Sequence, residues 1–362
     1  MDFLADLSAE ARWYLSSFSA LDRYFGREEQ PVLHVTVEGD LITLARAIPE
    51  LEFPGVRHAD AATWHEGRRV YFRCIEPESK PRPQSFRPLN LLFDPERERY
   101  LDPYDDYRAL RGEVLEPTDE PREPIDRLTD AAIAVSRYPH ELHEALEPVS
   151  SFPELAPETI RSLLAQILTG PFAHKGLALL EEHGFVEAYL PELAGMHGTR
   201  HSKEHHPEGD VWTHSLETFR YRRSRDLTLT LGLLLHDSGK PLAVPNGNRR
   251  FDGHAEIGAK LARKLLRRLG FSEDVMEDVA WLVSKHMFPG ALHLLPTFRT
   301  ERLMADARFP ILLELYRCDL ESTYRGPDGY YRACKIYRDF MKHSANPYRS
   351  ADGKKLVRLY VD

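Results

Sequence analysis

A proline-rich segment about a third of the way along the chain constrains the fold most strongly, because no regular element can pass through it. Residues 116–124 hold three prolines and four acids. Proline lacks a backbone N–H and has a fixed φ, so neither a helix interior nor a central strand tolerates this composition. The sequence therefore predicts a linker here and a change of architecture between its two sides.

The residues before the linker mix helix and strand patterns, so 1–115 are predicted to form an α+β domain. Apolar spacing predicts an amphipathic helix over 9–25. A shorter helix is predicted over 41–47, with Asp40 as its N-cap. Runs of alternating or β-branched residues predict the strands, which are 31–37, 69–75 and 89–93.

After the linker, apolar residues recur every three to four positions, which is typical of helices. Residues 116–200 are predicted as a linker with an all-α neck, and 201–362 as a second all-α domain. The neck helices are predicted at 125–136, 139–146, 156–169, 172–183 and 185–190. Those of the last domain are predicted at 211–222, 226–236, 254–269, 272–286 and 310–324.

Composition narrows the possible classes of protein. A formal net charge of −9 argues against a surface coated for non-specific nucleic-acid binding, although a local basic groove is still allowed. No apolar run is long enough for a membrane span, and the acidic N-terminus lacks the basic start of a secretory signal. Three widely separated cysteines form no disulfide framework, so we expect a cytoplasmic protein with no membrane partner.

Histidines and acids in the last domain predict a metal site. An all-apolar run, 231–235, indicates a buried helix, and His236-Asp237 ends it. Imidazole and carboxylate suit divalent ions such as Mn, Fe, Ni, Co or Zn, and Mg is also allowed. Any single histidine is more often an ordinary core or surface residue, so the prediction rests on the whole set. The predicted ligands are His214, His236, Asp237 and Asp319 for one ion, with His254 and His286 added for a second.

The ligand set predicts a chemistry. In a site with two ions, Asp237 would bridge them, and metal-bound water would attack phosphorus. Lys240 is predicted to be a catalytic and substrate-binding cation beside a phosphate oxygen, with Gly239 leaving the backbone open for close approach. Glu208 and Asp210 are predicted to orient the ligand imidazoles.

Three segments give these residues a family resemblance. They are HPEGDVWTH (206–214), LLLHDSGKP (233–241) and FDGHAEIGA (251–259). Together they resemble the HD domain of bacterial class II tRNA nucleotidyltransferases and their poly(A) polymerase relatives. The resemblance implies a metal-dependent phosphohydrolase that acts on nucleotides or RNA 3′ ends, such as 2′,3′-cyclic phosphates, with tRNA as a possible partner.

The N-terminal part is similar to the same family in fold rather than in chemistry. The segments SFRPLNLLFD (85–94) and YLDPYDD (100–106) resemble parts of the family's nucleotidyltransferase domain. The family's Gly-Gly-x-x-Arg-Asp helix start, which holds triphosphate, is not found. Its Asp-x-Asp strand, which holds two magnesium ions, has only 34–36 or 37–40 as counterparts. The resemblance therefore implies a degenerate nucleotidyltransferase-like domain.

Two other functions stay open at this point. One is an active CCA-adding tRNA nucleotidyltransferase whose acids come from unexpected positions. The other is a non-catalytic RNA- or nucleotide-binding regulatory protein that uses the basic runs 220–225 and 260–268 as its binding face. Each run alone is more often a solvated helix face. The sequence leaves the oligomeric state and the identity of the metal undetermined.

Overall fold

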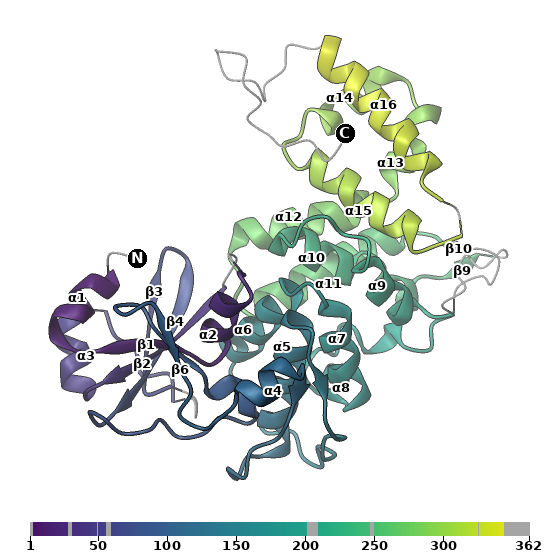
Figure 1. Cartoon of the computed structure of the whole chain (residues 1–362). Helices are drawn as coiled ribbons and strands as arrows, with labels where there is room; N and C mark the ends of the chain where they lie inside the picture. The colour runs from purple at the N-terminus through teal and green to yellow at the C-terminus, as the bar shows by residue number, and fades with distance from the viewer. Residues whose placement is uncertain are drawn as a thin grey trace. The chain divides into compact units, whose positions relative to one another are not determined.

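The computed structural model of the chain describes residues 3–27, 31–48, 50–55, 59–200, 209–246, 250–324 and 326–343. The chain forms two compact units (Figure 1). Unit 1 comprises 1–153 and 162–183, and unit 2 comprises 154–161 and 184–362. The three-domain division at 115/116 and 200/201 stays a prediction.

Unit 1 is built on a mixed sheet with strand order β3-β4-β2-β1-β5-β6. Strand β2 pairs in parallel with β4 and antiparallel with β1, so it lies in the interior of the sheet. The predicted strands 31–37 and 69–75 are confirmed as β2 and β4. The strands are β1 (Trp13–Ser16), β2 (Val32–Glu38), β3 (Ala61–His65), β4 (Arg68–Ile75), β5 (Leu92–Asp94) and β6 (Arg99–Leu101).

Alternation along β2 divides the sheet into two faces. Leu33, Val35 and Val37 point into a hydrophobic core that also contains residues of α1 (Phe3–Glu10) and α3 (Leu41–Ala47). Asp40 caps α3 as predicted, since its carboxylate accepts a hydrogen bond from the Thr43 N–H at 2.8 Å. The opposite side of β2, which we call the second face, carries Val32, His34, Thr36 and Glu38.

The predicted helix over 9–25 is wrong in its middle. The chain forms α1, then β1, and then α2 (Ser17–Tyr24), which begins directly after the strand. Ser17 makes this sharp turn with φ of 50°, in the left-handed region that usually needs glycine. Pairing of β1 with β2 and β5 outweighs the local helical spacing, which is a tertiary effect that periodicity cannot register.

Two segments quoted for the family resemblance meet in space within unit 1. The Asn90 side chain donates a hydrogen bond to Asp106 at 2.8 Å, and Asp102 accepts from the Asp106 N–H at 2.7 Å. The predicted strand 89–93 is partly correct, because a 3₁₀ turn (Arg87–Asn90) precedes the short β5.

Helices complete unit 1. Arg137 at the end of α5 makes a bidentate ion pair with Asp22 of α2, with both N–O distances at 2.9 Å. The predicted helix 139–146 is wrong, because residues 141–142 pair with the linker-side strand β7 instead. The remaining elements of this stretch are α4 (Tyr107–Arg111), β7 (Val114–Leu115), α5 (Pro124–Arg137), β8 (Glu141–Leu142), α6 (Pro157–Leu168) and α7 (Ala173–Glu182).

Unit 2 is mainly helical. Helix α10 is apolar and buried from Leu229 to Leu235, as predicted for 226–236, and it packs against α12 and α15. Ser272 caps α12 as its composition indicates, whereas α9 ends at Thr218, four residues earlier than predicted. The helices are α8 (Phe185–Tyr189), α9 (Val211–Thr218), α10 (Leu227–Leu235), α11 (His254–Arg268), α12 (Glu273–Lys285), α13 (Phe288–Ala291), α14 (Thr297–Met304), α15 (Phe309–Glu321) and α16 (Asp328–His343).

The fold class is therefore as predicted, with an α+β N-terminal part followed by helical structure. Within the described ranges, no helix has the length and apolar character that crossing a membrane requires.

Candidate metal centre

The predicted ligands in unit 2 converge because each lies in a helix or at a helix end. His236 and His286 are the C-cap residues of α10 and α12, and His254 is the first residue of α11. His214 lies within α9, and Asp319 lies in the last turn of α15. The four histidines and Asp237 are nearly inaccessible to solvent.

Backbone carbonyls fix the tautomers of three of these histidines. The Nδ1 atom of His236 lies 2.8 Å from the carbonyl three residues before it in the chain. The corresponding distances are 2.7 Å for His254 and 2.8 Å for His286. A carbonyl can only accept, so Nδ1 carries the proton in each ring. The neutral rings therefore present an Nε2 lone pair, which is the form that binds metal.

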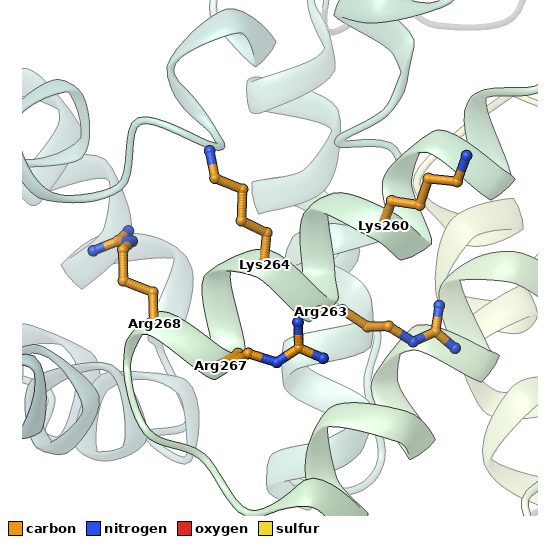
Figure 2. A pocket seen from close by; sticks show the side chains of 5 residues that line it. All are labelled: Lys260, Arg263, Lys264, Arg267 and Arg268. Carbon is orange, nitrogen blue, oxygen red and sulfur yellow. The ribbon is translucent and has the colours of Figure 1, made fainter.

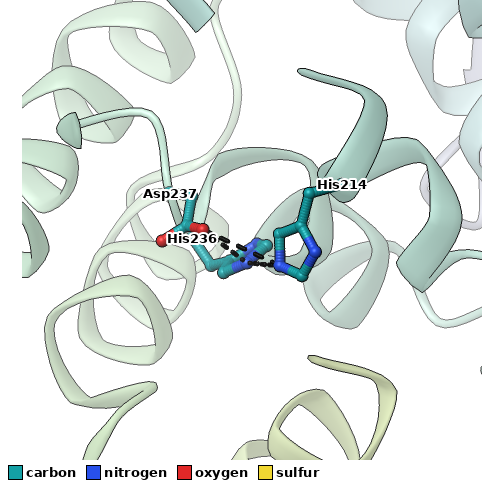
Figure 3. A group of neighbouring side chains, drawn as sticks. All are labelled: His214, His236 and Asp237. Atoms are coloured by element: carbon teal, nitrogen blue, oxygen red, sulfur yellow. Dashed lines mark hydrogen bonds and ion pairs between the residues drawn. The ribbon is translucent and has the colours of Figure 1, made fainter. Parts of the chain in front are cut away.

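The Nε2 atoms of these rings and of His214 approach one another in two places. The Nε2 atoms of His214 and His236 are 3.4 Å apart, and those of His254 and His286 are 3.2 Å apart. Asp237 lies between the two pairs. Its Oδ2 is 3.3 Å from His236 and 3.8 Å from His214, whereas its Oδ1 is 3.5 Å from His254 and 3.7 Å from His286. Figure 3 shows the His214, His236 and Asp237 group.

A second carboxylate completes the His214 side of the centre. Asp319 Oδ1 lies 3.0 Å from His214 Nε2 and 3.9 Å from His236 Nε2. The Ser322 hydroxyl contacts the other ring nitrogen of His214 at 3.4 Å. The sequence analysis missed Ser322, since an isolated serine has no distinguishing pattern. All six predicted ligands are thus brought together.

The electrostatics keep the two carboxylates charged and favour the neutral form of two of the imidazoles. Burial lowers the pKa of His286 to about 4, and it also lowers the pKa of His254. Burial opposes ionisation of Asp237, but the Lys240 charge outweighs it and holds the pKa of that carboxyl well below its ordinary value. For Asp319 the hydrogen bond with His214 overcomes burial, so its pKa is lowered as well.

This arrangement fits divalent cations. The facing Nε2 lone pairs of His254 and His286 repel one another unless a cation lies between them, and buried carboxylates need a positive partner. Among the described residues, His214, His236 and Asp237 form one compact group of potential ligands, and Asp237, His254 and His286 form another. Because one carboxylate serves both groups through different oxygens, these residues could hold one ion in each group.

The neighbours of the centre have other contacts than predicted. Lys240 Nζ lies 2.5 Å from Asp237 Oδ2, so its charge is directed at the carboxylate. Gly239 is needed for packing, because a Cβ there would lie 2.0 Å from the His254 carbonyl oxygen. Asp210 caps α9 by accepting from the Thr213 N–H at 2.8 Å, so it positions His214 through the helix. Glu208 lies outside the described residues.

Among the described residues of unit 1, the second face of the sheet offers no comparable set. Glu38 is the only acid that β2 carries, and it accepts a hydrogen bond from the Tyr14 hydroxyl at 2.6 Å. Burial and this hydrogen bond raise the Tyr14 pKa to about 12. Asp40 is engaged as a helix cap. Two magnesium ions need at least a pair of carboxylates, so β2 does not fit them.

Comparison with known proteins places these features in a family context. Residues 211–309 match the HD domain family. A CC-adding tRNA nucleotidyltransferase of Thermus thermophilus is 37% identical over 243 residues, which cover 63% of this chain and 50% of the relative. An A-adding tRNA nucleotidyltransferase of Deinococcus radiodurans is 31% identical over 267 residues, which cover 67% and 59%. The chain thus spans between half and three fifths of the length of these relatives.

Solved structures give the same result for the fold. The CCA-adding enzyme of Bacillus stearothermophilus, solved with CTP, superposes with a TM-score of 0.55 at 17% identity, covering 94% of this chain and 81% of that one. The chain contains a region, 211–309, that matches the HD domain. It is homologous to tRNA nucleotidyltransferases, and its N-terminal sheet has the nucleotidyltransferase fold.

These comparisons correct one expectation. The predicted phosphohydrolase function is wrong, because the relatives at 31–37% identity are named for nucleotide addition to tRNA. The predicted function rested on the HD segment alone, whereas the homology extends over about two thirds of the chain. The hydrolytic roles of Asp237 and Lys240 depended on that function, so they are not carried further.

Proposed function

We propose that this chain is an enzyme that acts on the 3′ end of tRNA as a nucleotidyltransferase, with a nucleoside triphosphate as its second substrate. The observation that carries the proposal is the homology to transferases at 31–37% identity, together with their fold. Those relatives are named as CC-adding and A-adding proteins, so partial additions are the activities to test first.

The test is incorporation of labelled CTP or ATP into tRNA transcripts that lack one, two or three of the terminal CCA nucleotides, with Mg²⁺ present. We expect elongation of at least one transcript. If no transcript is elongated while tRNA is still bound, the transferase proposal is wrong.

A second function, tRNA binding without transfer, is favoured by the side chains of β2. Val32, His34 and Thr36 alternate with the core residues on the face where paired carboxylates would be needed. The turn into α2 is also built from Ser16 and Ser17 rather than glycines. Binding with no incorporation on any transcript would support this second function.

We also propose that the centre in unit 2 binds two divalent transition-metal ions. His214, His236, Asp237 and Asp319 would hold one ion, and Asp237, His254 and His286 the other. Bound there, such ions would supply Lewis acidity beside a buried carboxylate. The chain's own contribution is to fix the imidazole tautomers through backbone carbonyls.

A further inference from the structure

One helix of unit 2 carries a strip of cations that the metal centre does not use. Lys260, Arg263, Lys264, Arg267 and Arg268 follow one another at helical spacing along α11 and line a cavity of about 460 Å³ (Figure 2). The five cations share one helix face, although the formal net charge of the chain is −9. We call these five residues the α11 strip.

Acids beside the strip fix part of it in place. Glu277 of α12 makes a bidentate ion pair with Arg263, at 2.8 and 2.7 Å. Glu192 pairs with Arg268, at 3.2 and 2.7 Å, and lies 3.8 Å from Lys264. These contacts hold the guanidinium planes at the two sides of the strip in defined orientations.

The rest of the strip keeps its charge available. Lys260 and Arg267 are exposed, and within the described ranges neither makes an ion pair. With two acids against five cations, the strip retains a net charge of +3 (5 − 2 = 3). A concave surface of that charge suits a polyanion whose charges are spaced along a strand.

The shape of the helix favours RNA over a membrane surface. The apolar side of α11, including Ala259, Ala262 and Leu266, is buried inside unit 2, so no hydrophobic face is left to insert into lipid. From Lys260 to Arg268 the helix advances about 12 Å, which is long enough to face more than one phosphate of a strand.

We propose that the α11 strip binds the phosphate backbone of tRNA. The proposal rests on the proposed function for the identity of the RNA, and it adds the surface of this chain that holds it. The strip begins about 9 Å along the helix axis from His254. Because the strip would contact phosphates rather than bases, binding there should depend little on base sequence.

The experiment is fluorescence anisotropy of a labelled tRNA transcript with the full chain at several salt concentrations. Lys264→Glu/Arg267→Glu should weaken binding about tenfold or more at low salt. It should also reduce the slope of log K against log salt by about two, because two phosphate contacts are removed. Arg332→Glu/Lys335→Glu on α16 is the matched control, with the same charge change at the same spacing on exposed residues, and should change binding less than about twofold.

A neutral variant keeps the test valid if the charge reversal impairs folding. Lys260→Gln/Arg267→Gln removes the two unpaired cations and should weaken binding about threefold or more, with unchanged circular dichroism. Equal affinities and equal salt slopes for the strip and control variants would overturn the proposal that the α11 strip binds tRNA. The transferase proposal would stay intact. Wild-type protein that binds no tRNA would overturn both, and binding without incorporation would count against transfer alone.

Discussion

The centre in unit 2 and the sheet in unit 1 belong to the same homologous framework, yet they differ in what their side chains can bind. In unit 2, two carboxylates and four imidazoles converge from five helices or helix ends. In unit 1, the interior strand β2 keeps its place in the sheet but offers a single acid, Glu38. The two regions thus share one framework, but among the described residues only the first gathers a set of potential metal ligands.

Any dependence of this chain on metal should originate in unit 2. Ligands at helix ends are fixed by capping positions and by backbone carbonyls, so the centre in unit 2 is preorganised by the fold itself. The sheet in unit 1 is held together by its core and by the buried pair of Asp22 and Arg137. The two regions should therefore respond to different perturbations.

Metal removal should have the largest effect, and it should act on unit 2. Chelation should lower the free energy of unfolding by about 4 kcal/mol when free metal had been about 1,000 times its Kd. Calorimetry with and without EDTA measures this, and Asp237→Asn should abolish the response. A transition of unit 1 that shifts equally on chelation would break the proposed difference between the regions.

Loss of the buried ion pair should be the next largest effect, and it should act on unit 1. Arg137→Ala leaves the Asp22 carboxylate buried without its partner, at a cost of about 3 kcal/mol. Urea unfolding of the full chain measures it, with the metal content as a control that should not change. A loss below about 1 kcal/mol would show that solvent or another group replaces the guanidinium.

A buried carboxyl in unit 1 should make stability depend on pH. Burial raises the pKa of Asp106 to about 6, which the hydrogen bond from Asn90 only partly offsets. Between pH 4 and 6 the folded state therefore holds a proton that the unfolded state has lost, so this group lowers stability as pH rises through that window. Asp106→Asn should gain about 1–2 kcal/mol over wild type between pH 4 and 7. Parallel pH profiles for the two proteins would contradict this cause.

The smallest effect should come from the cap of the helix that carries His214. Asp210→Ala removes the acceptor for the Thr213 N–H and should cost about 1 kcal/mol. Because His214 lies one turn into α9, the same change should weaken metal binding modestly, whereas Asp40→Ala, which uncaps α3 in unit 1, should not. Metal titration of both variants tests whether only the loss of the α9 cap weakens metal binding.

The sequence predicted which side chains converge in unit 2 better than it predicted the N-terminal fold, and their role as metal ligands stays a prediction. Ligand-type residues in a fixed order predicted all six members of the centre, because their chemistry is visible in their identity. Helices with strong apolar spacing, such as α10 and α12, were also predicted correctly. Strand β1 was missed because four residues carry no period, and its pairing partners lie more than 18 positions away.

Other features were beyond prediction because they depend on contacts. The packing of Gly239 against the His254 carbonyl follows from the close approach of α11. The contact of Lys240 with Asp237 depends on how the chain turns after α10. The function assigned from the HD segment was wrong, since a domain shared by many proteins does not fix the reaction of the chain.

Metal analysis of the purified full chain tests the central difference most directly. Wild type, Asp237→Asn and Glu38→Gln would be dialysed against Mn²⁺, Co²⁺ or Ni²⁺ and their metal content measured. We predict about two ions per chain for wild type and Glu38→Gln, and almost none for Asp237→Asn. Metal that survives Asp237→Asn but is lost in Glu38→Gln would contradict the account and place the ions at the sheet.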